Sequence, residues 1–316
     1  MRQSSKQQAP ISISLNFDSL NEAYGFPQSY RDPSFFVAFD RLVDLTSKHG
    51  LTFTVYIIGK DLENPEYFAR VREWASAGYE IGNHSWHHYF NIGALKPNQI
   101  REEVYRAHDR IAECSKREPR GFIAPAWAVS RHLIEVLIDL RYSYDTSFFP
   151  SLLLYPMLAR IALNHAGMPR KALRMLDRKD WLVPLNKPLR PFFVDRSFRC
   201  AAVRGPDSLL VLPLPTVTRF GPAIWHSVGF TLGWKTVCNQ LQKLLQSHDG
   251  FYYLIHPGDF LAPEELHSTL KHCLHRMNVP LANKMAFLDE VFGLMAASGR
   301  PKVTMAELAR YHGAEA

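Results

Sequence analysis

The first strongly patterned stretch of the chain alternates apolar and polar residues over positions 11–18. The apolar side chains stand at the odd positions and the polar ones at the even positions, a period of two that predicts a strand. The polar side chains of this strand, which end with Asn16 and Asp18, point to the face opposite the apolar side chains. Apolar residues then recur at helical spacing over 35–48, before Gly50, which predicts a helix.

The same kind of pattern continues as alternating strands and helices. Strands are predicted at 51–58, 79–83, 121–124, 142–145, 208–212, 251–256 and around 303, and helices at 65–77, 97–114, 131–140, within 229–246, and at 264–277, 283–297 and 305–311. This alternation predicts an α/β fold, a parallel sheet or barrel built from βα units. In such folds, functional residues gather where the strands end and the loops begin.

The composition excludes disorder and places the positive charge in one region. The 316 residues are 47% hydrophobic, enough for a full core. The net charge is +7, and residues 151–200, with ten basic and three acidic residues, carry an excess of the same size. This concentration argues against a nucleic-acid binder whose whole surface is basic, so no nucleic-acid partner is expected. It indicates either a local contact with an anionic neighbour or a solvated helix face.

The termini and the cysteines indicate a cytoplasmic protein. Residues 1–10 are polar and lack the apolar core of a secretory signal, and no run of eighteen apolar residues predicts a membrane-spanning helix. The four cysteines, Cys114, Cys200, Cys238 and Cys273, show no paired spacing and are expected to be buried thiols. We expect a disordered tail over 1–10 and a single domain over 11–316.

Several predicted strands carry polar side chains at their carboxyl ends. These are Asp18, the run Asn-His-Ser-Trp-His-His at 83–88, Asp145 and His256. His84 and His88 have the spacing that places two imidazoles one above the other on a helical turn, and Asp18 would complete a two-histidine, one-carboxylate metal set with a position open for water. The alternative is that these histidines make only local hydrogen bonds. His87 does not have this spacing and is not expected to bind the metal.

Five stretches, taken in order, resemble the NodB-like polysaccharide deacetylases, carbohydrate esterase family 4. They are LNFDS at 15–19, EIGNHSWHH at 80–88, GFIAPAW at 121–127, YSYDTS at 142–147 and LIHP at 254–257. The second is the most specific, because it is close to the family's metal motif of histidine, Ser/Thr, two residues and histidine. The resemblance runs from about Ile11 to Leu308 and implies a distorted (β/α) barrel of parallel strands.

The resemblance also implies an activity and a cofactor. Family members are metal-dependent hydrolases that remove an N-acyl group, acetyl or formyl, from a sugar, and here the setting would be bacterial envelope glycan metabolism. The metal is a divalent ion, usually zinc, although a set of two imidazoles and a carboxylate also accepts cobalt, nickel, iron or manganese. Carried over by position, the ligands would be Asp18, His84 and His88.

Further roles follow from the same positions. His256 would be the acid that protonates the leaving amine. Pro125, Trp127 and Leu254 would bind the substrate, with Trp127 and Leu254 shaping the acyl pocket. The N-acylated sugar is therefore the expected partner, and the oligomeric state is not predicted.

The sequence departs from the family at the catalytic base. Members commonly end the first strand with two acids, the first acting as the base and the second as a ligand, but here only Asp18 is present. In an acid-x-acid register Asn16 occupies the base position and could only orient water, because an amide does not accept a proton near neutral pH. With adjacent acids, Asp18 would be the base and Ser19 would stand at the metal. We favour the first register.

A second departure is Ile123, where many members place an arginine that braces the catalytic aspartate. Either another group takes the proton from water, such as a hydroxide on the metal or a nearby acid, or the protein is slow or inactive. Two alternative functions therefore stay open. One is a non-carbohydrate amidase on the same barrel, and the other is a catalytically impaired protein that binds carbohydrate or a lipid carrier.

Residues 150–205 form an insertion that is longer than a βα unit needs. Its first half interleaves apolar and basic residues at helical spacing, which suits either a helix in a membrane interface or a helical lid with its arginines in solvent. Beside a deacetylase-like groove, the insertion predicts an anionic substrate, a sugar linked to a lipid phosphate or to a nucleotide. It also predicts peripheral contact of residues 151–199 with anionic lipid at the inner face of the membrane.

Overall fold

A computed structural model describes residues 8–164, 169–247, 249–266 and 275–315. Within them, one sheet has the strand order β7-β6-β8-β5-β4-β3-β2-β1-β9. The strands are β1 (Ile11–Phe17), β2 (Thr54–Ile57), β3 (Glu80–Asn83), β4 (Gly121–Phe122), β5 (Tyr144–Asp145), β6 (Phe192–Asp195), β7 (Cys200–Ala201), β8 (Ser208–Val211) and β9 (Phe251–Ile255). The run from β8 to β9 is parallel, which confirms the α/β class. No hydrogen-bonded pair among the described strands joins β7 to β9, so this sheet is not a closed barrel.

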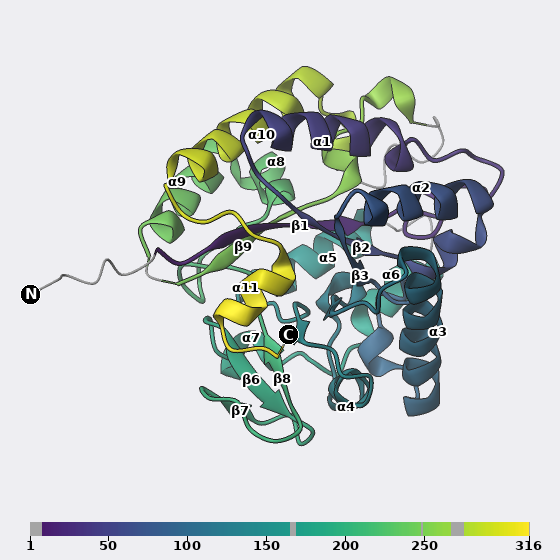
Figure 1. Ribbon diagram of the computed structural model, residues 1–316, viewed down its shortest axis with the longest axis vertical. Coiled ribbons are helices and arrows are strands. Elements are labelled where there is room, and N and C mark those ends of the chain that lie inside the picture. Colours follow the sequence, from purple (N-terminus) through teal and green to yellow (C-terminus); the bar gives the residue numbers. More distant parts are fainter. Residues whose placement is uncertain (1–7, 165–168, 248, 267–274, 316) are drawn as a thin grey trace, which may run out of the picture.

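Eleven helices, counted within the described residues, accompany the sheet (Figure 1). They are α1 (Val37–Lys48), α2 (Pro65–Ser76), α3 (Pro97–Ser115), α4 (Arg131–Asp139), α5 (Leu154–Asn164), α6 (Pro169–Leu176), α7 (Val183–Asn186), α8 (Gly229–Leu232), α9 (Trp234–Leu245), α10 (Leu281–Ala297) and α11 (Met305–Tyr311). The last begins and ends at the residues predicted from the sequence. Most of the predicted helix at 264–277 lies outside the described residues.

Strand β1 is buried on both faces, although its sequence alternates apolar and polar residues. Its apolar row joins the core cluster that also contains residues of α1, α2, α9 and α10. Its polar row faces the inner side of the sheet, because Ser14 is in register with Leu254 and Asn16 with Tyr56, two residues of a separate inner cluster. The polar row is therefore an interior feature rather than a solvent-exposed one.

The inner cluster is closed at the amino ends of the strands by α11. Met305, Leu308 and Ala309 pack into it, and Glu80 Oε2 accepts a hydrogen bond from the backbone N–H of Ala306 at 2.9 Å. Gly82 lines the same space, where an added Cβ would lie only 2.5 Å from the ring of Tyr56. With the amino end filled, the end left for a functional site is the carboxyl end of the parallel strands.

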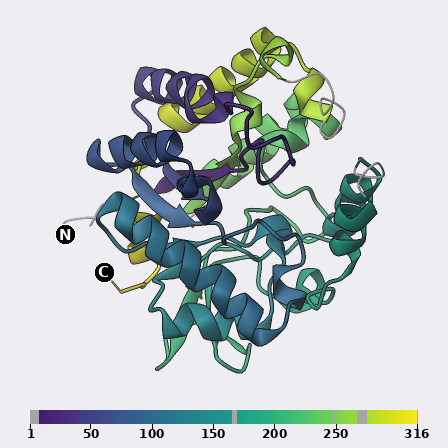
Figure 2. The same ribbon diagram turned by 90° about the vertical axis from the view of Figure 1, so that its right-hand side faces the viewer.

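The insertion is not only helical. Helices α5 and α6 pack against each other as a hairpin at the margin of the molecule (Figure 2). Further along, β6 pairs antiparallel with β8 and with β7, which extends the sheet at one edge. The sequence pattern did not predict these two strands. They were missed because they are short and lie in a segment dominated by charge.

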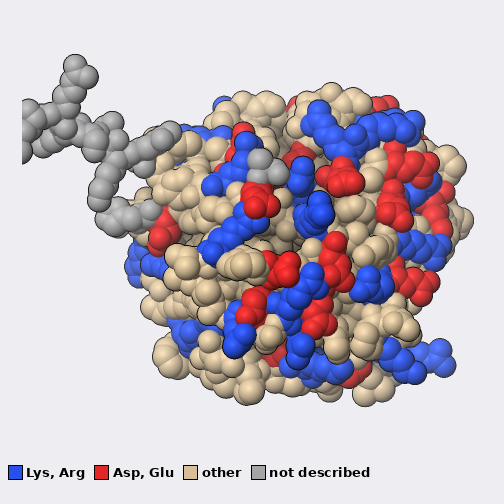
Figure 3. Space-filling model, turned by 60° about the horizontal axis from the view of Figure 1, so that its bottom comes forward, with Lys and Arg blue, Asp and Glu red and all other residues tan. Residues whose placement is uncertain are grey.

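Much of the positive charge in the insertion is bound by the protein itself. Arg178 and Asp180 form a fully buried ion pair, and Lys187 donates to the carbonyl oxygen of Phe198 at 2.8 Å. Three further pairs are Arg190–Asp249, Arg196–Asp139 and Arg199–Asp195. Figure 3 shows one face of the molecule, where basic and acidic side chains are intermixed. Asp180 and Asp195 are already part of the count within 151–200, but Asp249 and Asp139 lie outside it, and these two partners reduce the local excess of positive charge.

Three smaller predictions need correction or limitation. Ala9 and Pro10 are buried rather than part of a disordered tail, while residues 1–7 lie outside the described residues. Cys200 is exposed, unlike Cys114 and Cys238, and Cys273 also lies outside the described residues. The predicted strand near 303 is a single bridge between Ile11 and Lys302. Among the described helices, none combines the length and apolarity needed to span a membrane.

Candidate metal and catalytic site

The two histidines of the predicted metal motif lie on a loop after β3, not on a helical turn. Ser85 and His88 have positive φ angles of 65° and 55°, which interrupts any helix. Asn83 Oδ1 accepts from the backbone N–H of Ser85 at 2.8 Å, and Ser85 Oγ accepts from that of His88 at 3.2 Å. These bonds to short polar side chains determine the path of the loop, so local side-chain chemistry replaces helical spacing.

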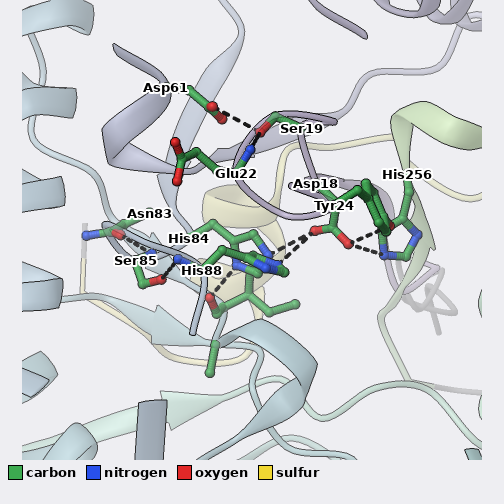
Figure 4. A network of polar contacts seen from close by, with 12 residues as sticks. Asp18, Ser19, Glu22, Tyr24, Asp61, Asn83, His84, Ser85, His88 and His256 are labelled. Atoms are coloured by element: carbon green, nitrogen blue, oxygen red, sulfur yellow. Dashed lines mark hydrogen bonds and ion pairs between the residues drawn. The ribbon is translucent and has the colours of Figure 1, made fainter. Parts of the chain in front are cut away.

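The loop directs both imidazoles toward Asp18, which follows β1 (Figure 4). Asp18 Oδ1 lies 3.1 Å from His84 Nε2 and 3.3 Å from His88 Nε2, and the potential ligand atoms of the three residues all lie within 4.8 Å of one another. His84 Nδ1 donates to the carbonyl oxygen of Ile123 at 2.7 Å, which leaves the Nε2 lone pair for a metal. This donor set fits a divalent metal that accepts nitrogen and oxygen ligands.

The charge of Asp18 is maintained by its neighbours. Burial raises the pKa of this carboxyl, but the electrostatic interaction with His88 and the hydrogen bonds with His84 and His88 outweigh burial, so the pKa lies well below its usual range. Asp18 therefore stays an anion, the form that a metal requires. His87 turns away, since its Nδ1 lies 2.5 Å from Glu103 Oε1.

Asp18 and Ser19, the two candidate ligands of the registers that the sequence left open, make different contacts. Ser19 Oγ donates to Asp61 Oδ1 at 2.9 Å, and burial raises the pKa of Asp61 well above its usual range. Ser19 is thus engaged in a bond with Asp61, whereas Asp18 faces both histidines. This geometry supports Asp18 as the ligand. Asn16, two residues earlier on the inner face, is buried, and its Oδ1 has no hydrogen-bond partner among the described residues.

His256 approaches Asp18 from the opposite side to His84 and His88. Its Nε2 lies 3.8 Å from Asp18 Oδ2, and its backbone N–H donates to Asp259 Oδ2 at 2.8 Å. Burial and the nearby Arg276 lower the pKa of His256 to about 4. The imidazole is therefore neutral at pH 7 and able to accept a proton before it donates one.

An aromatic wall stands beside His256. Trp225 lies with its ring centroid 5.5 Å from that of His256 and 5.1 Å from that of Trp127. Leu254, which bridges to Trp225, belongs to the same cluster. Pro125 begins the short turn that carries Trp127, whose φ is 55°. Trp127 and Leu254 thus each contact Trp225, a residue that the sequence reasoning missed because no motif surrounds it.

Sequence reasoning also missed a buried polar group behind Asp18. Tyr24 donates to Asp18 Oδ2 at 3.4 Å and accepts from Arg276 Nη2 at 2.8 Å. Arg276 Nε in turn lies 3.8 Å from Asp259 Oδ1. These contacts connect both carboxylates to one guanidinium. Arg276 is far from Asp18 in the sequence. The one sequence signal that could have indicated its role is a basic residue after the last strand.

The arrangement defines an α/β protein with a candidate metal centre of two histidines and one carboxylate. Residues 6–144 match the family described as Polysaccharide deacetylase, and this match supports the resemblance of the chain to the NodB-like polysaccharide deacetylases. A peptidoglycan deacetylase of Helicobacter pylori (strain ATCC 700392 / 26695) is 26% identical over 159 residues, 50% of this chain and 52% of that protein. The uncharacterized protein YlxY of Bacillus subtilis (strain 168) is 23% identical over 100 residues, 32% of this chain and 30% of YlxY. The chain thus spans about half or less of the curated relatives it matches.

Solved structures show the same fold at low identity. A putative polysaccharide deacetylase from Mycobacterium smegmatis has a TM-score of 0.59 at 15% identity, covering 98% of this chain and 92% of that one. A probable polysaccharide deacetylase from Pseudomonas aeruginosa PAO1 has a TM-score of 0.58 at 12% identity, covering 96% and 90%. A family 4 pseudoenzyme from Bacillus anthracis has a TM-score of 0.50 at 12% identity, covering 96% and 66%. At identities of 15% or less, these solved structures show the fold alone.

Proposed function

We propose that this protein is a metal-dependent hydrolase that removes an acetyl or formyl group from the nitrogen of a sugar in bacterial envelope glycan metabolism. The observation that carries the proposal is the arrangement around Asp18, whose Oδ1 faces His84 and His88 while its Oδ2 faces His256. The two proposed histidine ligands and the proposed proton donor would thus lie on two sides of the Asp18 carboxylate, at the carboxyl end of the parallel strands.

The residues divide into three roles. Asp18, His84 and His88 would hold the divalent metal, preferably zinc, and the metal when bound would polarise the acyl carbonyl. His256 carries a proton to the amine nitrogen as it leaves. Trp127 and Leu254 enclose the small acyl group from one side, and Pro125 sets the turn beneath them.

The proposed substrate is an N-acylated sugar on an anionic carrier, either a lipid phosphate or a nucleotide. The insertion supports this choice, because it brings exposed leucines and arginines to one part of the surface. Leu163 on α5 is 74% exposed and Leu173 on α6 is 67% exposed, and Arg160, Arg170 and Arg174 are exposed on the same two helices. We propose that this hairpin touches anionic lipid from the cytoplasmic side.

Turnover by the zinc-loaded protein tests the proposal. Release of primary amine is measured on a panel of N-acetylated and N-formylated amino sugars, free and carrier-linked. His84→Ala is expected to abolish release, and His256→Ala to reduce it more than about 100-fold. His87→Ala, three residues from His84 but bound to Glu103, is the matched control and is expected to retain activity.

A second candidate function is favoured by one observation. Asn16 places an amide, not a carboxylate, on the inner face two residues before Asp18. This suits a protein that binds the metal and the carrier but does not catalyse hydrolysis. One bound metal ion per chain, with no amine released from any compound of the panel, would establish this second function. Release from amides that contain no sugar would instead identify an amidase.

A further inference from the structure

A pocket of about 290 Å³ lies beside the candidate site, between α5 and the segment that leads into α8. Its wall is mainly apolar. The apolar lining residues are Phe149, Leu153, Pro156, Met157, Pro222, Ala223, Trp225, Val228, Phe230 and Leu232. The charged lining residues are two arginines, Arg160 and Arg276, and no acidic residue is among the lining residues of the described chain. The pocket is therefore both apolar and positive.

Two residues connect this pocket directly to the catalytic groups. Trp225 forms part of its wall and contacts the ring of His256 on its other side. Arg276 also lines the pocket and donates to Ser227 and to Tyr24, which in turn donates to Asp18. A ligand in the pocket would thus lie one side chain away from the reacting groups.

Two of the lining residues carry buried hydrogen-bond donors. Trp225 and Arg276 are 8% and 5% exposed, and Trp225 Nε1 and Arg276 Nε have no hydrogen-bond partner among the described residues. Arg276 Nε has only a distant ionic neighbour, Asp259 Oδ1 at 3.8 Å. A buried donor without an acceptor is costly, so an anionic oxygen at this position would be favoured.

The rim continues the apolar character to the surface. Leu232, which lines the pocket, is 46% exposed, and Phe220, two residues before Pro222, is 79% exposed. Arg160 is exposed on α5 at the same pocket. Water-exposed apolar side chains beside a cation match a molecule with an acidic head and a long apolar chain.

We propose that this pocket binds the phosphate and the first part of the apolar chain of a lipid-phosphate carrier, to which the acylated sugar is attached. The inference rests on the proposed function, and it favours a lipid phosphate over a nucleotide as the carrier of the sugar. A nucleotide base needs several polar partners, whereas Ser227 and Thr231 are the polar uncharged residues in the described lining. Guanidinium groups suit a phosphate, and the wall suits a hydrocarbon.

Binding of dodecyl phosphate below its micelle concentration tests the pocket by calorimetry on the full chain. We expect one site per chain, with affinity more than about tenfold above that for inorganic phosphate or uridine diphosphate. Met157→Trp fills the pocket and is expected to weaken binding more than about tenfold, as is Arg160→Ser. Arg131→Ser, which changes an exposed arginine on α4 outside both the lining and the insertion, is the matched control and is expected to leave binding unchanged.

Three outcomes would overturn the inference. They are absence of dodecyl phosphate binding, binding that neither Met157→Trp nor Arg160→Ser weakens, and uridine diphosphate binding as tight as that of dodecyl phosphate. Retained zinc binding shows that Met157→Trp, Arg160→Ser and the arginine control are folded. His84→Ala is expected to bind dodecyl phosphate normally, so failure of the proposed hydrolysis and failure of this pocket are separate results.

Discussion

His84 donates its Nδ1 hydrogen to the carbonyl oxygen of Ile123 at 2.7 Å, and this bond turns its Nε2 toward Asp18. Ile123, whose side chain differs from the arginine common in the family, therefore contributes to the candidate metal centre through its backbone carbonyl. The side chain of Ile123 is fully buried in the inner cluster. A change of side chain at this position need not disturb the ligand, because the supporting atom is a carbonyl.

Metal binding is expected to depend on His84 and not on His87. Removing one of three ligands takes away a metal bond and leaves the Ile123 carbonyl without its donor. We expect His84→Ala to lower zinc affinity more than about 100-fold, while His87→Ala changes it little. Competition with a chromogenic chelator measures both. Equal zinc affinity in the two variants would contradict the ligand assignment.

Asn16→Asp is expected to increase turnover. The new carboxylate would stand on the inner face two residues before Asp18, where a base could take a proton from the attacking water. Positioned general bases contribute about 100-fold or more. Initial rates of amine release are compared for the parent, Asn16→Asp and Asn16→Ala. If Asn16→Asp is no faster than the parent, Asn16 does not stand at the base position.

The buried pair Arg178–Asp180 is expected to hold the turn that carries Trp127. Arg178 donates to the carbonyl oxygens of Ala126 and Trp127 at 2.9 and 3.0 Å, and Asp180 accepts from the backbone N–H of Val129. Arg178→Met would leave the charge of Asp180 buried alone, at a cost of roughly 3–5 kcal/mol in the free energy of unfolding. Urea denaturation measures this. The surface variant Arg199→Met is the control, expected to cost under about 1 kcal/mol.

His226 is expected to make stability fall in mildly acidic solution. Burial lowers the pKa of His226 from 6.5 to about 4, while its ring stacks on Phe287 at 4.2 Å and its Nδ1 lies 3.0 Å from Tyr253 Oη. The unfolded chain binds a proton first, so the stabilisation is complete above pH 6.5 and is lost as the pH falls toward 4. The loss is roughly 3 kcal/mol.

The His226→Gln variant isolates this contribution. Glutamine can still bond to Tyr253 but does not titrate, so its urea midpoint is expected to fall less between pH 7 and 4.5 than that of the parent. Other buried histidines affect both proteins equally. A parallel fall in the two midpoints would show that His226 is not held neutral.

Membrane contact is expected to depend on the α5–α6 hairpin. The double variant Arg170→Ser/Arg174→Ser removes two exposed charges, each contributing about 1 kcal/mol near an anionic surface. Co-sedimentation is measured with phosphatidylcholine vesicles, with and without phosphatidylglycerol. We expect the parent to bind only the anionic vesicles and the variant to lose about tenfold or more in binding. A parent protein that binds neither kind would refute peripheral contact.

Local pattern alone determined the strands and helices of the repeating framework, and the resemblance of short motifs brought out Asp18, His84, His88 and His256. A period of two or 3.6 indicates elements because it reports which face of a segment is buried, and the motif residues lie near one another because the carboxyl ends of parallel strands meet at one edge. The tertiary structure decided the rest. The loop of His84 and His88 follows hydrogen bonds to Asn83 and Ser85 rather than helical spacing.

The partners of the site come from distant parts of the chain. Tyr24 and Arg276 are separated by 252 positions, and the insertion's Arg190 finds Asp249. No local period carries such pairings, because they arise only when burial brings separate elements together. The sequence by itself therefore determined the fold class and the candidate ligands. Only the folded chain decided which charges are neutralised and which cations are left to face a pocket.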